Sequence, residues 1–113
     1  MSIGYTWEKL YGAVLALVHS EGPLEHRLAS AYRAMHMLTP ADFPDEDLRT
    51  DYTTLVHAWR TGVRQKRQDA VAPAPGVLPP DHAHALAEQL LRLYTDITRL
   101  EEQHYRSFSA RAL

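Results

Sequence analysis

The stretch LAEQLLRLYTDITRLEEQH, residues 86 to 104, decides the fold class of this chain. Its apolar residues return every three or four positions, which is the spacing of one face of an α-helix. We expect this helix to begin at Asp81, an N-cap residue by type, and to end near Ser107. The apolar stripe is formed by Leu86, Leu90, Leu93, Ile97, Leu100 and His104.

Aromatic residues widen this stripe at positions 94, 105 and 108. A stripe wider than a coiled-coil seam can contact helices of its own chain and a second surface at once. This helix is also expected to be longer than those before it, which would leave part of its apolar face uncovered. We therefore predict a protein interface on it. The predicted interface residues are Leu86, Leu90, Leu93, Tyr94, Ile97, Leu100, Tyr105 and Phe108.

Three shorter helical patterns precede this helix. The first is expected to start after Thr6 as its N-cap and to end at Gly22. The second would open at Pro23, since a missing N–H group costs nothing at the first helical position, and would carry apolar residues to Leu38. The third follows the acidic residues 45–47, which suit a helix N-terminus. Between the second and third, Phe43 is expected to cover one end of the helices.

The helical patterns together predict one all-α domain over residues 1–113. We expect an antiparallel bundle of four helices, with a long linker before the last and longest helix. The linker is expected over residues 61–80, where a basic stretch is followed by a Pro-rich one. No alternating pattern bounded by hairpin turns argues for strands.

Composition narrows the classes of function. Hydrophobic residues make up 45% and charged residues 23% of the chain, as in ordinary globular proteins. A net charge of -2 gives no overall basic field for nucleic acid or membranes. The chain has no cysteine, which excludes disulfides and thiolate chemistry and suits the cytoplasm. Its longest apolar run, residues 13–18, is too short to span a membrane.

Arg99 and His104, near the C-terminus, are separated by four residues. This spacing resembles the Arg-x(4–6)-His signature of HEPN-type ribonucleases, which are small all-helical proteins. The resemblance implies that both side chains would act on an RNA phosphate, with two motifs brought together across a dimer. The first residue inside the motif is commonly polar in that family, whereas here it is Leu100. An ordinary helix with a polar tip on its apolar stripe explains the same residues.

Seven histidines raise the question of a metal site. Two ligands on one helix need a spacing of three or four residues, and no two histidines have it. Carboxylates could complete a pair, as Glu101 does with His104 and Glu88 with His84, but neither pair forms a strong motif. We expect no metal and no cofactor.

Two charged patches flank the third helix. A basic patch is formed by Arg60, Arg64, Lys66 and Arg67, which could bind phosphate or an acidic partner. An acidic patch is formed by Asp42, Asp45, Glu46, Asp47 and Asp51. Both patches also fit the helix dipole, which favours acidic residues at the N-terminus and basic residues at the C-terminus. Nucleic acid is therefore a secondary candidate as a partner.

The sequence favours a non-catalytic helical interaction or regulatory subunit. Its partner would be a second copy, giving a homodimer, or a larger protein, and contact would be made through the last helix. The alternative is a HEPN-like protein that cleaves or binds RNA with Arg99 and His104.

Overall fold

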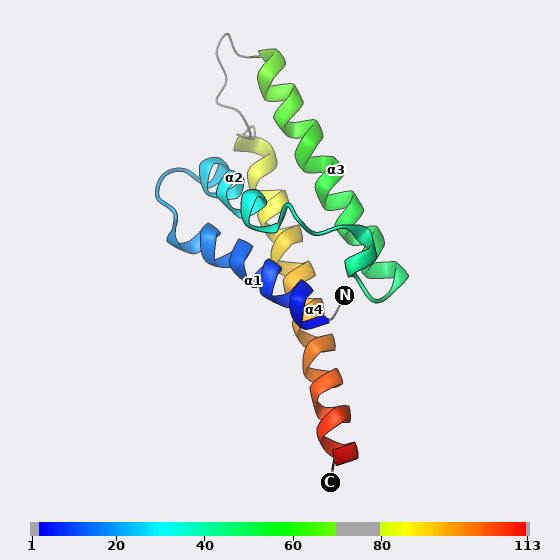
Figure 1. Cartoon of the computed structure of the whole chain (residues 1–113). Coiled ribbons are helices and arrows are strands. Elements are labelled where there is room, and N and C mark those ends of the chain that lie inside the picture. The colour runs from blue at the N-terminus through cyan, green and yellow to red at the C-terminus, as the bar shows by residue number, and fades with distance from the viewer. Residues whose placement is uncertain (1–2, 70–79, 113) are drawn as a thin grey trace.

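The computed structural model describes residues 3–69 and 80–112, and the side chains of residues 3–61 and 82–107. This part of the chain is all-helical and has no strand, which confirms the all-α class (Figure 1). It contains four α-helices and one short 3-10 helix. They are α1 (Ile3–His19), α2 (Leu24–Met35), η1 (Pro40–Asp42), α3 (Glu46–Asp69) and α4 (Pro80–Ala112).

Helices α1 and α2 differ at their ends from the sequence-based expectation. Helix α1 begins at Ile3, and Thr6 is a buried residue within it instead of its N-cap. The Thr6 hydroxyl donates a hydrogen bond of 2.6 Å to the carbonyl oxygen of Asp42. Pro23 is the N-cap of α2 and not its first helical residue. Helix α2 ends at Met35, so Leu38 reaches the core from the connector that follows.

The expected linker over 61–80 is wrong for its first nine residues, because α3 continues to Asp69. A glycine inside a helix costs only about 1 kcal/mol relative to alanine. Residues 63–68 are mostly good helix formers, and no proline occurs between Gly62 and Pro73, so Gly62 does not end the helix. The Pro-rich residues 70–79 lie outside the described part of the chain.

Helix α4 contacts all three other α-helices, and a single core contains side chains from each of them. The residues of α4 that belong to this core form the first part of its apolar stripe. Phe43 is 1% exposed and its ring centroid lies 4.7 Å from that of Tyr52, as expected for a residue covering one end of the helices. Tyr32 and Trp59 join α2 to α3, with ring centroids 5.2 Å apart.

The connector between α2 and α3 is fixed by buried polar contacts. The Asp42 carboxylate accepts the N–H group of Thr39 at 2.8 Å, which closes a capping box around η1. The Tyr52 hydroxyl donates a hydrogen bond of 2.7 Å to the carbonyl oxygen of Leu38. Burial raises the pKa of Tyr52, which keeps the hydroxyl protonated as a donor. These contacts hold α3 to the rest of the chain.

Helix α4 extends well past the other helices at its C-terminal end (Figure 1). With 33 residues it is the longest of the described helices, as expected, and spans about 50 Å at 1.5 Å per residue. It runs to Ala112, several residues beyond the predicted end near Ser107. In the described part of the chain, no helix combines the length and apolarity that crossing a membrane would need.

Candidate functional site

The predicted interface on α4 divides into a buried part and an exposed part. Four of its residues lie in the chain's own core with exposures of 2% or less. These are Leu86, Leu90, Leu93 and Ile97. They hold the fold together, and their side chains are almost inaccessible to a partner. Leu100 is half-buried, Tyr105 is 68% exposed, and the Phe108 side chain lies outside the described part.

Tyr94 contacts aromatic residues of α1. Its ring centroid lies 6.3 Å from that of Trp7 and 6.3 Å from that of Tyr11. Trp7 and Tyr11 stack on each other at 5.0 Å. The Trp7 indole also donates a hydrogen bond of 3.0 Å to the Thr98 hydroxyl on α4. Tyr94 therefore helps to attach α1, and the exposed remainder of the predicted interface is the end of α4.

The end of α4, residues 102–112, is named the projecting end below. Every side chain described there, from residue 102 to residue 107, is exposed. Glu102 and Arg106 form an ion pair of 2.6 Å within the helix, and both side chains are exposed. Tyr105 is the described large apolar residue with the greatest exposed fraction, 68% against 67% for Val18 on α1.

A groove runs between α3 and α4 and contains three hollows. The upper hollow has a volume of about 250 Å³ and lies between residues 57–61 of α3 and residues 82–89 of α4. Its walls include the side chains of His57, Thr61, His82, Ala85 and Gln89. None of the described side chains that line it is an aspartate, glutamate, lysine or arginine.

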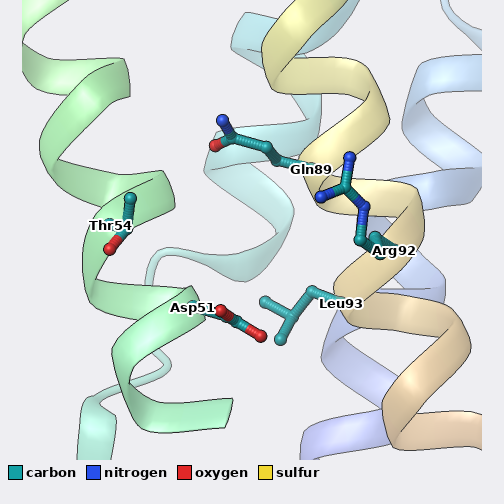
Figure 2. Close-up of a pocket in the computed structure, with 5 residues that line it drawn as sticks. All are labelled: Asp51, Thr54, Gln89, Arg92 and Leu93. Atoms are coloured by element: carbon teal, nitrogen blue, oxygen red, sulfur yellow. The ribbon is translucent and has the colours of Figure 1, made fainter. Parts of the chain in front are cut away.

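The middle hollow has a volume of about 220 Å³ (Figure 2). Asp51 and Thr54 approach it from α3, and Gln89, Arg92 and Leu93 approach it from α4. Gln89 also lines the upper hollow, and Asp51 also lines the lower one. Neighbouring hollows therefore share a lining residue, and all three lie between α3 and α4.

The lower hollow is acidic and has a volume of about 280 Å³. Four carboxylates and one guanidinium line it, so its formal charge is negative. The carboxylates belong to Asp45, Asp47, Asp51 and Asp96, and the guanidinium to Arg99. Asp45 also accepts the N–H group of Leu48 at 2.8 Å, in keeping with the expected match between the acidic patch and the start of α3.

Sequence analysis missed the α4 wall of this groove, although a signal was present. His82, Gln89, Asp96 and Gln103 recur every seven residues, and all four line the hollows. A polar row of this period runs beside the apolar stripe and faces a neighbouring helix. The spacing of α3 from α4, which opens the groove, has no counterpart in the sequence of either helix.

Arg99 and His104 are both exposed and lie on α4, but they do not line the same hollow. Arg99 faces the lower hollow among carboxylates, while His104 belongs to the projecting end. Five residues along an α-helix correspond to a rotation of about 140°. A carboxylate-lined hollow repels phosphate, so the surroundings of Arg99 do not favour RNA. Pairing of two motifs across a dimer, as the HEPN resemblance implies, stays a prediction.

The basic patch lies on α3, which is helical through all four of its positions. Arg60 is exposed, and a side-chain hydrogen bond with Tyr32 raises its pKa above the ordinary value for arginine. The side chains of Arg64, Lys66 and Arg67 lie outside the described part. Phosphate binding by this patch remains a prediction.

Within the described residues, no group of three or more histidine, aspartate or glutamate side chains is arranged to hold a metal ion. The chain matches no protein-family model, no curated protein and no solved structure. The candidate sites are therefore the projecting end of α4 and the groove between α3 and α4.

Proposed function

We propose that this chain is a non-catalytic helical interaction subunit that associates with a second copy of itself through the projecting end of α4. One observation carries the proposal: α4 continues past its last packed residues, and Tyr105 on this extension is 68% exposed. The proposal treats the four helices as an antiparallel bundle from which α4 extends. It also keeps the cytoplasmic location suggested by the cysteine-free composition.

An uncovered helix end of this length gains little stability from its own interactions. Isolated helices shorter than about 12–15 residues are marginal in water. The ion pair between Glu102 and Arg106 adds only about 0.3–0.5 kcal/mol, because both side chains are exposed. Packing against another surface would supply the missing stability.

Charge complementarity favours a second copy as that surface. The projecting end carries Arg106 and Arg111 against Glu102, a formal charge of +1 with His104 neutral, whereas the lower hollow carries four carboxylates against Arg99. The basic end of one copy would lie in the acidic hollow of the other, with Tyr105 covered between them. A two-fold axis makes this exchange reciprocal, so both ends are covered in a closed dimer. A larger protein with an acidic groove is the competing partner.

The first test is sedimentation velocity across micromolar concentrations of the full chain. We expect a monomer–dimer equilibrium, and Tyr105→Glu should weaken it at least tenfold by placing a charge in the contact. Val18→Glu is the matched control, because Val18 is equally exposed but lies on α1. A monomer at every concentration, or equal effects of both substitutions, would contradict self-association through α4.

The second test is charge exchange between the two predicted contact surfaces. Arg106→Glu should weaken the dimer, and Asp47→Lys should do the same from the other side. Combining the two substitutions should restore part of the affinity, because opposite charges meet again. If the dimer forms but the double variant is no better than either single one, the projecting end contacts a different surface.

A further inference from the structure

The middle hollow is lined by side chains of opposite charge that come from facing helices. Asp51 lies on α3 and Arg92 on α4, and Figure 2 shows the Asp51 carboxylate pointing across toward α4. Along both helices, the nearest residue without a described side chain is eight positions from the lining residues, or about 12 Å. The described walls therefore present one carboxylate and one guanidinium to the same space.

Neither of these two charges is paired within the described part of the chain. The one ion pair there lies in the projecting end, so Asp51 and Arg92 do not pair across the hollow. Glu88 and Asp96 stand four positions before and after Arg92, a spacing at which helical ion pairs form, yet Arg92 pairs with neither. The side chains of Asp51 and Arg92 also make no hydrogen bond among the described residues. Both groups are therefore available to a molecule that enters the hollow.

The chemistry of the two groups defines which class of molecule would satisfy both. A guanidinium binds a carboxylate through two parallel N–H donors, and a carboxylate accepts hydrogen bonds from an ammonium group. A simple anion or cation would meet one favourable and one unfavourable charge. An uncharged molecule would displace water from both groups without replacing its hydrogen bonds. A zwitterion, which carries a carboxylate and an ammonium group, is favoured at both walls.

The size of the hollow and the absence of a further charge on its described walls narrow the class again. A volume of about 220 Å³ lies below the range of about 300–1,000 Å³ that is typical of drug-sized ligands, which suits a single amino acid. Leu93 adds an apolar surface between the two charged groups. The described lining holds no second pair of charges for a charged side chain of the ligand.

We propose that the middle hollow binds a free α-amino acid with an apolar side chain, with its carboxylate on Arg92 and its ammonium group on Asp51. The side chain of the ligand lies against Leu93. The proposal does not rest on self-association, because both charged groups belong to one copy of the chain. Asp51 also lines the lower hollow, so sedimentation velocity is run on the same samples to measure the dimer separately.

The test removes one charge of the probe at a time. L-Leucine is compared with L-leucinamide, which lacks the carboxylate, and with N-acetyl-L-leucine, which lacks the ammonium group, in ¹H–¹⁵N NMR titrations of the full chain. We expect saturable shifts at residues 51–54 and 89–93 with L-leucine. Each analogue should bind roughly tenfold more weakly, as expected for loss of hydrogen bonds to a charged group. No saturable shift with L-leucine, or equal binding of either analogue, overturns the proposal.

Two variants assign the two ends of the ligand. Arg92→Gln should remove the preference for L-leucine over L-leucinamide, and Asp51→Asn should remove the preference over N-acetyl-L-leucine. Both side chains are exposed, so the variants should keep the fold, which their NMR spectra outside residues 51–54 and 89–93 would report. Glu88→Gln is the control for Asp51→Asn, since it removes a negative charge four positions from Arg92 at a residue outside the lining, and it should leave the affinity within about twofold. Equal weakening by Glu88→Gln and Asp51→Asn, or preferences that survive both hollow variants, would overturn the proposal.

Discussion

The two halves of α4 carry one apolar pattern but stand in opposite environments. Leu90 and Ile97 in the first half are fully buried by helices of the same chain, whereas Tyr105 in the projecting end is 68% exposed. The pattern shows which face of the helix is apolar and is therefore favoured to be buried. It does not show which chain supplies the cover, because that depends on the length and position of the neighbouring helices.

Helix length accounts for the contrast. Helix α1 has 17 residues and α2 has 12, which correspond to about 26 Å and 18 Å. Neither can cover a helix of about 50 Å. The hydrogen bond from Trp7 to Thr98 joins α1 to α4 four residues before the projecting end begins. Beyond it, the described side chains from residue 102 onward are exposed.

The largest expected effect is a difference in the free energy of unfolding between substitutions in the packed part of α4 and in its projecting end. Leu90→Ala should lower the free energy of unfolding by about 3 kcal/mol, because it removes a fully buried side chain and leaves a cavity. Tyr105→Ala should change it by less than about 0.5 kcal/mol in the monomer. Urea denaturation below the dimer dissociation constant measures both. Similar losses for the two variants would mean that the projecting end is packed within the monomer.

A smaller effect is expected where the two halves meet. Thr98→Val should cost about 1 kcal/mol, because the Trp7 indole loses its acceptor on α4. Thr95→Val is the control, since both hydroxyls donate a 2.8 Å bond within the helix, but only Thr98 contacts α1. In thermal unfolding, Thr98→Val should have a lower Tm than Thr95→Val. The reverse order would count against a contact with α1 at this position of α4.

The packed region should also respond to alkaline pH through Tyr52. Burial, and then the nearby Tyr32, raise the pKa of Tyr52 above the ordinary 10.0, so the folded state holds this proton more tightly than the unfolded state. Its contribution is complete below pH 10.0 and is lost as the pH rises from there through the folded pKa.

Tyr52→Phe isolates this contribution. At neutral pH the variant should be less stable by about 1 kcal/mol, because the hydrogen bond to the Leu38 carbonyl is lost. As the pH rises above 10.0 toward the raised folded pKa, the difference from the unmodified chain should shrink. Urea denaturation across this range measures the difference, and a constant gap would show that Tyr52 titrates normally in the fold.

The smallest effect is expected within the projecting end. Glu102→Gln should lower monomer stability by no more than about 0.5 kcal/mol, since the ion pair with Arg106 is exposed. Circular dichroism at low and high salt measures it. A loss well above 1 kcal/mol would indicate that the pair belongs to a packed structure within one chain.

The sequence was sufficient to predict the all-α class, the stripe of α4 and the burial of Phe43, because each follows from local spacing or residue type. It failed at Gly62, where one unfavourable residue was outweighed by the helix formers after it. It also failed at the groove, since Gln89 and Asp96 become a wall only when α3 stands opposite them. The distance between two helices depends on the whole core and not on either segment.

Hydrogen exchange as a function of protein concentration tests self-association through α4 most directly. Amides of residues 86–97 should be protected at every concentration, because the chain's own core covers them. Amides of residues 102–112 should exchange rapidly in dilute protein and become protected as the dimer forms. Rapid exchange of residues 102–112 at all concentrations, alongside stable protection of residues 86–97, would contradict the proposal that a second copy covers the projecting end.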